Sequence, residues 1–244
     1  MRIQQSTTAA IIAALGIAIA GLFVGIGFER GRSADRYVTV KGVAEREVTA
    51  DLAIWPLRVV AADNDLTVAH AKLEASVQKI MQFLAAQKID TTGATLANFE
   101  VSDAFANQYG GGNNAPQRYV IRQAVVVRSN DPERVLAASQ HVAELVGSGV
   151  VLSSGGEYGA GGPNFVFTDL NKLKPAMIGE ATSRAREAAE QFARDSKSSL
   201  GGIMTANQGV FEILPRDQAQ GITQESQVAK TIRVVSTVNY FLKD

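Results

Sequence analysis

The N-terminal segment most constrains this chain, because residues 3–28 contain no charged side chain. As a helix this run extends about 39 Å at 1.5 Å per residue, whereas the hydrocarbon core of a bilayer is about 30 Å thick. Apolar residues surround the segment on every side instead of forming one stripe, which disfavours a buried helix of a globular domain. The sequence therefore predicts a membrane segment, with residues 7–28 in contact with the lipid bilayer.

A cleaved signal peptide is the alternative interpretation of this segment. Residues 18–20 (Ala-Ile-Ala) offer a small-x-small cleavage site. The apolar run nevertheless continues through residues 22–28, whereas the apolar centre of a secretory signal usually has about 7–15 residues. We therefore favour an uncleaved transmembrane anchor over residues 1–28, followed by a polar linker over residues 29–36. Arginines on both sides of the run leave its orientation open under the positive-inside rule.

Composition excludes several classes of function. The 24 basic and 24 acidic residues balance, so no global field attracts the chain to nucleic acid, and no basic run is interleaved with aromatic residues. Cysteine is absent, which removes disulfides, thiolate nucleophiles and cysteine-ligated zinc. This absence fits an oxidising compartment such as a periplasm. We expect no nucleic-acid partner.

Alternating apolar residues and turn residues predict the strands of the domain after the linker. Pro56 cannot donate a ladder hydrogen bond, so we expect an edge position or a bulge there. Phe99, Val101 and Phe105 are expected on one face of their strand. The expected strands cover residues 37–42, 52–61, 99–105, 119–127, 149–152, 164–167, 209–214 and 229–242.

Three helices are expected from their starting residues and from helical spacing. The first follows Asp-Asn-Asp at residues 63–65 and extends to about residue 87. The second begins at Pro132 and ends near Gly147. The third follows Asp169, is kinked or started by Pro175, and ends before Gly201 and Gly202. The apolar faces are expected to comprise Leu66, Leu73, Val77, Ile80, Met81 and Leu84 in the first helix and Leu173, Met177, Ala181, Ala185, Ala188 and Phe192 in the third.

This order of elements predicts an α+β fold with antiparallel-rich sheets backed by three main helices. From residue 52 the order is βαββαβ, the ferredoxin-like arrangement, followed by βαββ. We expect one domain over residues 37–244, with halves over residues 37–160 and 161–244.

Several stretches together resemble the SIMPL-domain family of bacterial envelope proteins, which includes periplasmic immunogenic proteins. They are YVTVKGVAEREVTADLAIWPLRVV, YVIRQAVVVRSNDPERV, NFVFTDLNKLKPAMIGEATSRAREAAEQFA and TIRVVSTVNYFL, and the resemblance covers residues 37–242. It implies an α+β fold, an N-terminal signal or anchor, an envelope location and homo-oligomers that in some members form channel-like rings. It also implies a loose link to oxidative-stress tolerance. The family has no established catalytic residues. The glycine loops at residues 110–112 and 155–162 look longer than the family's usual turns, so the resemblance implies no role for them.

The residue patterns carry little catalytic chemistry. His70 and His141 lack a second ligand at metal spacing, and the serine pairs at residues 153–154 and 198–199 lack a nucleophile elbow. The loop GGEYGAGGP precedes a strand instead of a helix, which favours an assembly loop over a phosphate site. The carboxylate pairs Glu45/Glu47 and Glu187/Glu190 fit solvated faces. We predict no catalytic, cofactor-binding or metal-binding residues, and hence not an enzyme.

Three functional hypotheses follow. The first is a single-pass inner-membrane protein whose C-terminal domain lies in the periplasm and self-assembles into a ring or cage with a scaffolding role, possible partners being other copies and the bilayer. The second is a periplasmic module that binds a ligand or partner in the groove between its two α/β halves, without large assembly. The third is an enzyme with a polar cluster around Asp103, Tyr109 and Arg122. Copy number and the physiological ligand stay open.

Overall fold

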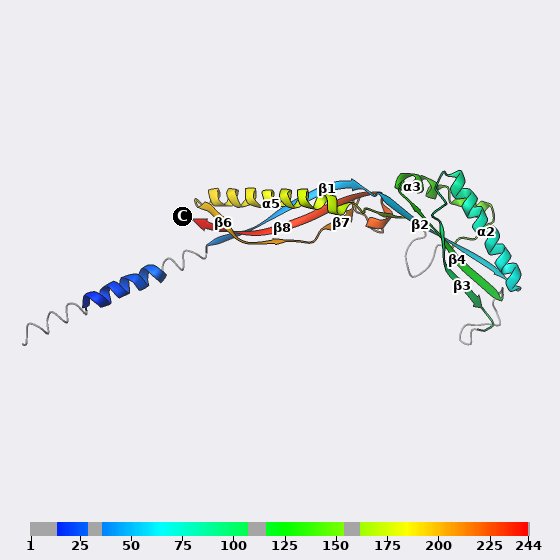
Figure 1. Ribbon diagram of the computed structural model, residues 1–244, viewed down its shortest axis with the longest axis horizontal. Coiled ribbons are helices and arrows are strands. Elements are labelled where there is room, and N and C mark those ends of the chain that lie inside the picture. The colour runs from blue at the N-terminus through cyan, green and yellow to red at the C-terminus, as the bar shows by residue number, and fades with distance from the viewer. Residues whose placement is uncertain (1–13, 29–35, 107–115, 154–161, 244) are drawn as a thin grey trace, which may run out of the picture. The chain divides into compact units, whose positions relative to one another are not determined.

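The computed structural model in Figure 1 describes residues 14–28, 36–106, 116–153 and 162–243. Residues 14–28 form a helix whose side chains are exposed throughout. In the described part of the chain, no helix is both long enough and apolar enough to cross a bilayer. Residues 7–13 of the expected membrane segment and all but the last residue of the expected linker lie outside the described residues.

The remaining elements form an α+β protein with two antiparallel sheets, as predicted. In chain order they are β1 (Tyr37–Thr49), β2 (Leu52–Asp63), α2 (Leu66–Ala86), β3 (Thr95–Asp103), β4 (Tyr119–Ser129), α3 (Pro132–Gln140), α4 (Ala143–Gly147), β5 (Asn164–Val166), α5 (Leu170–Asp195), β6 (Ser199–Gln208), β7 (Glu212–Pro215), the 3₁₀ turn η1 (Gln224–Ser226) and β8 (Ala229–Lys243).

The chain divides into two compact units, each assembled from separate segments. One comprises Met1–Ala44, Pro175–Phe211 and Val234–Asp244, and the other comprises Glu45–Lys174 and Glu212–Arg233. We call them the α5 unit and the α2 unit. The sequence-based division instead placed a single boundary after residue 160.

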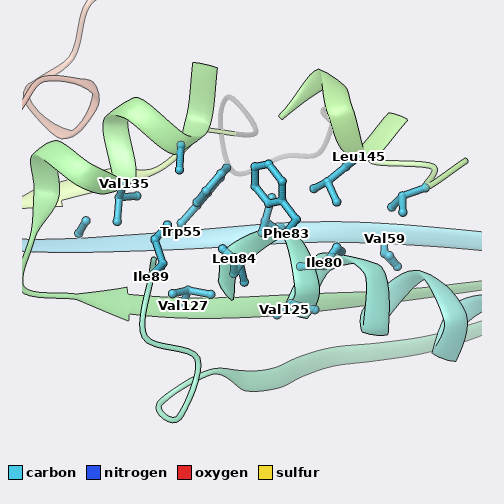
Figure 2. Close-up of a cluster of buried hydrophobic side chains, with 14 of the residues drawn as sticks. Trp55, Val59, Ile80, Phe83, Leu84, Ile89, Val125, Val127, Val135 and Leu145 are labelled. Carbon is cyan, nitrogen blue, oxygen red and sulfur yellow. The ribbon is translucent and has the colours of Figure 1, made fainter. Parts of the chain in front are cut away.

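The α2 unit is built on a sheet with the order β3-β4-β2-β5, in which neighbouring strands are antiparallel. Odd-numbered residues of β2 and β4 point into a core with the helices, and Figure 1 shows α2 and α3 along one face of this sheet. Figure 2 shows the centre of that core, where the rings of Trp55 and Phe83 meet edge to face at 6.3 Å. Such aromatic pairs stabilise a core beyond the area that they bury.

Helix α2 begins and ends close to where the sequence predicts. The Asp65 side chain accepts hydrogen bonds from the backbone N–H groups of Thr67 and Val68, which satisfies donors that a helix start leaves free. Leu73, Ile80 and Leu84 are buried as expected, but Leu66 is 43% exposed.

Two expectations for this unit are corrected by the structure. The second helix ends at Gln140, and a separate short helix, α4, covers Ala143–Gly147. Residues 149–152 form only an isolated bridge between Leu152 and Val59, so the sixth element of the expected βαββαβ order is not a strand. The ferredoxin-like arrangement stays a prediction.

Pro56 lies where β2 has a partner on only one side among the described residues. It pairs with Val126 of β4 without a register shift. On the other side, β5 pairs with residues 52–54, and the next described contact is the hydrogen bond from the Ser153 N–H to the Arg58 carbonyl oxygen. The missing N–H of proline therefore leaves no gap in a described ladder.

The α5 unit contains a sheet with the order β1-β8-β6 and the helix α5. The buried stripe of α5 has a strict spacing of four residues, and it comprises Met177, Ala181, Ala185, Ala189 and Ala193. The prediction that Ala188 and Phe192 continue this stripe is wrong, since Ala188 is exposed and Phe192 is 50% exposed. A row of residues four apart winds slowly about a helix axis.

Small residues let β1 lie directly against α5. A Cβ atom on Gly42 would lie 1.8 Å from the carbonyl oxygen of Ala181, so only glycine fits at this crossing. Helix α5 continues through Pro175.

Gly201 and Gly202 lie inside strand β6, not at the end of a helix region as expected. The ladder between β6 and β8 shifts register beside Gly201, where a Cβ atom would lie 2.9 Å from the carbonyl oxygen of Phe241.

Candidate interaction surfaces

The histidines and carboxylates singled out from the sequence lie apart from one another in separate, exposed pairs. His70 lies 3.8 Å from Glu74, and His141 lies 3.2 Å from Glu144. Glu45 contacts Arg233 at 3.4 Å. Within the described ranges, no group of three or more His, Cys, Asp or Glu side chains is arranged to hold a metal ion.

The remaining candidates form local contacts of the chain. Glu187 accepts a hydrogen bond from Ser183, and Glu190 accepts one from Arg186 on the same helix. The Ser199 hydroxyl donates to the Lys243 carbonyl oxygen at 3.3 Å. Ser154, Tyr109 and most of both glycine loops lie outside the described residues.

The polar cluster expected around Asp103 and Arg122 is divided between two ion pairs. Asp103 binds Arg118 through two guanidinium nitrogens, whereas Arg122 lies 3.7 Å from Glu100. The Arg118 hydrogen bond lowers the pKa of Asp103 and keeps it ionised. Arg118 also lies over the rings of Phe105 and Tyr119 at 5.7 and 4.8 Å. These contacts stabilise the end of β3 and the start of β4, on either side of the loop that joins them.

An exposed apolar surface follows the edge strand β3. We call it the β3 edge, and it comprises Leu96, Phe99, Val101 and Phe105, whose residues are 58%, 54%, 45% and 56% exposed. β3 pairs only with β4 among the described strands, so one side of its backbone is open. Exposed apolar edge strands are surfaces on which proteins pair.

The β3 edge continues into a shallow pocket on the helix side of the sheet. The pocket has a volume of about 370 Å³ and is lined by α2, β3 and β4. The His70 and Phe99 rings meet edge to face at 6.5 Å along its wall. Asn98 adopts a left-handed backbone (φ 54°) where the ladder shifts register between Ala97 and Glu100, and this bulge turns Phe99 toward α2.

The second surface is the face of the same sheet on which none of the described helices lies, and we call it the open face. It is formed by the even-numbered residues of β2 and β4, none of which belongs to the core cluster. Its apolar members, half-buried except for the buried Ala124, are Leu52, Ile54, Pro56, Val60, Ala62, Val120, Ala124 and Val126. Arg58, Arg122 and Arg128 lie among them.

The third feature is a pocket of about 620 Å³ between α3, β5 and the turn η1. Thr223, Glu225 and Ser226 form one wall, and Asn164 and Phe165 contribute from β5. A backbone hydrogen bond to the Glu225 carboxylate from its own N–H and a side-chain bond from Thr223 lower the pKa of Glu225.

A buried lysine stabilises the turn that forms one wall of this pocket. The sequence patterns did not lead us to predict this lysine. Lys230 is 1% exposed, and its Nζ donates to the carbonyl oxygens of Gln224 and Gln227. Burial lowers its pKa. Apolar residues at alternate positions of β8 could have indicated that Lys230 is buried, because Lys230 lies on the same face of the strand as the buried Ile232 and Val234.

These features define an α+β protein with antiparallel sheets, exposed interaction surfaces and shallow pockets. Residues 38–240 match the SIMPL family, described as a protein family of unknown function (DUF541). This match covers most of the chain, which therefore belongs to the SIMPL family, as its sequence segments indicate. No curated protein matches the chain.

Proposed function

We propose that this chain is an inner-membrane-anchored protein of the bacterial envelope that self-assembles, through its periplasmic SIMPL domain, into a ring- or cage-like homo-oligomer with a scaffolding role. The observation that carries the proposal is the β3 edge, which exposes four large apolar side chains beside an open backbone edge. An isolated exposed apolar residue is ordinary, whereas a contiguous group on an edge strand indicates a contact.

A second copy is the occupant that this edge fits best. An extended strand of another copy satisfies the open backbone groups of β3 and covers its apolar side chains at the same time. Because Phe99 and Val101 are each about half exposed, covering both contributes roughly 2–3 kcal/mol to a contact. Since each 1.4 kcal/mol is a factor of about ten in an association constant, this pair alone changes assembly measurably.

The test is the mass of the full chain in mild detergent, measured by native mass spectrometry and light scattering over a concentration series. We expect a homo-oligomer for the natural chain and dissociation at concentrations roughly ten- to a hundredfold higher for the variant Phe99→Ser/Val101→Ser. Both residues are about half exposed, so we expect the variant to retain the fold.

The matched control is Phe192→Ser/Val210→Ser, which removes the same two side-chain types from exposed positions of the α5 unit. Assembly that survives the β3 variant but not this control would assign the contact to the α5 unit. A monomer for the natural chain would refute the scaffold itself.

The apolar run of residues 3–28 supports the anchor. The helix over residues 14–28 is exposed, so its apolar side chains have no partner within the described chain. The intact mass of the purified protein tests this point. Retention of residues 1–20 is expected, and loss of about twenty residues identifies a cleaved signal peptide. Protection of the SIMPL domain from protease added to intact spheroplasts would place that domain on the wrong side for a periplasmic function.

A ligand-binding module is the second candidate, and the pocket between α3, β5 and η1 favours it. Its volume of about 620 Å³ suits a small molecule, and Thr223, Glu225 and Asn164 offer polar groups. A small molecule that co-purifies with a monomeric chain, seen as an added mass in the same native spectra, supports this candidate over the scaffold.

A further inference from the structure

The central strands of the α2 unit are apolar on both faces, although the helices of the described chain cover only one. In an antiparallel sheet with one solvated face, apolar and polar residues normally alternate. β2 departs from this rule, since Ile54, Pro56, Val60 and Ala62 occupy the face without helices. β4 adds Val120, Ala124 and Val126 to the same face. This composition is typical of a sheet face that another element covers.

The register of β2 and β4 places three arginines on the open face. Arg58 lies opposite Ala124, Arg122 lies opposite Val60, and Arg128 lies opposite Ile54. Each guanidinium therefore has aliphatic neighbours on the adjoining strand.

Only one of these arginines has a carboxylate partner in the described part of the chain. Arg122 contacts Glu100 at 3.7 Å. Arg58 and Arg128 have no ion pair there, and Arg58 is half-buried. The guanidinium of an arginine on an apolar surface is a strong donor for a carboxylate that approaches from outside.

We propose that the open face is a docking surface for an amphipathic helix of a partner protein, with a small aliphatic stripe flanked by carboxylates. Charge complementarity selects this occupant. A second copy of the same face would bring like-charged arginines together, which costs binding energy. A membrane surface fits less well, because the open face has neither the aromatic residues nor the lysines typical of interfacial contacts.

The other face of this sheet shows how a helix binds to these strands. There α2 packs through Leu73, Ile80 and Leu84 against residues of β2 and β4. The open face offers side chains of similar size at the same strand spacing, with arginines instead of aromatic rings. A partner helix with an apolar stripe like that of α2 would pack against the aliphatic side chains of the open face. Glutamates beside this stripe would pair with its arginines.

The probe is a synthetic amphipathic helix with a Leu/Ala stripe and glutamate flanks, labelled with a fluorophore. Binding to the full chain in nanodiscs of neutral lipid is measured by anisotropy at about 50 and about 300 mM salt, across which screening of exposed charges strengthens. Two comparison peptides are used. One carries lysines in place of the flanking glutamates, and the other has the composition of the probe in an order that forms no apolar stripe. We expect the glutamate-flanked peptide to bind about tenfold more tightly than either.

The variant Arg58→Gln/Arg128→Gln removes the two guanidiniums that have no ion pair in the described part of the chain, and it should weaken binding about tenfold or more. The matched control Arg184→Gln/Arg186→Gln changes the net charge equally on α5 and should leave binding within about twofold. Equal binding of the three peptides, unchanged binding by the Arg58/Arg128 variant, or weakening by the control alone would overturn the proposal. Binding of the chain to phosphatidylglycerol vesicles through the same arginines, without peptide discrimination, would overturn it in favour of a membrane contact.

Discussion

Two glycine-to-alanine substitutions should change stability in opposite directions. At Gly42 an added Cβ would lie 1.8 Å from the Ala181 carbonyl oxygen and 2.4 Å from the Ala185 nitrogen. Both contacts are with the backbone of α5, so no side-chain rotation relieves them. At Gly179, an exposed position inside α5, an added Cβ meets no atom within 4 Å.

The magnitudes follow from these contacts. Strand β1 and helix α5 must separate by about 1 Å before the new methyl fits at Gly42, and overpacking of this kind costs up to about 3 kcal/mol or more. Alanine also reduces the conformational entropy of the unfolded chain, which offsets roughly 0.5–1 kcal/mol of this cost. We therefore expect a net destabilisation of about 2 kcal/mol for Gly42→Ala. Gly179→Ala should stabilise α5 by about 1 kcal/mol, because alanine favours helices more than glycine does.

Thermal unfolding of the full chain in mild detergent, followed by far-UV circular dichroism, distinguishes the two. For a chain of this length 1 kcal/mol shifts the midpoint by about 2–4 °C, so Gly42→Ala should lower it by about 4–8 °C and Gly179→Ala should raise it by about 2–4 °C. Hydrogen exchange should quicken in α5 for Gly42→Ala alone. If both variants stabilise the chain, β1 does not lie against α5 as described.

Three further substitutions test the α2 unit. Phe83→Ala removes the ring beside Trp55, should cost about 3–5 kcal/mol, and can be followed by the fluorescence of this single tryptophan; a loss below about 1 kcal/mol would refute the packing. The lowered pKa of Asp103 contributes stability above pH 3.8 that is lost as pH falls through the folded-state pKa. The urea midpoint should therefore decrease less between about pH 5 and about pH 3 for Asp103→Asn than for the natural chain, and equal decreases would contradict this. Burial lowers the pKa of Lys230 below 10.5, so the unfolded chain binds more protons and stability rises as pH approaches that value. Lys230→Met should remove this rise and speed hydrogen exchange in residues 216–228, and an unchanged pH profile would count against the burial.

The elements with strong local determinants were predictable from the sequence. Helix α2 starts after Asp65 and α3 starts at Pro132, because a capping side chain and a proline act within one turn. The α+β class followed from the order of such elements, whereas the SIMPL family was indicated by the resemblance of whole sequence segments. Side chains at these positions determine the backbone conformation of neighbouring residues without a contact from a distant part of the chain.

Strand β6 could not be predicted from local preference, because glycines interrupt its apolar pattern. Gly201 is needed where β6 comes close to Phe241 of β8, and this requirement exists only once the sheet has formed. The stripe of α5 was misplaced for a related reason. Ala188 and Ala189 look alike in sequence, and only contact with the sheet selects Ala189 for burial.

The open face of the α2 unit shows how a mismatch between pattern and environment can indicate function. Local propensity and tertiary packing agree across the helix-covered face, where Trp55, Leu57 and Val59 are each 2% exposed or less. They disagree on the opposite face, where the same strands remain apolar around Arg58 and Arg128 and no helix of the described chain covers them. Natural sequences are locally consistent except where function requires otherwise. An acidic helix with an apolar stripe would complete a face that carries aliphatic side chains and two arginines without an ion pair among the described residues. For this reason we propose that the open face gives specificity and that the β3 edge gives self-assembly.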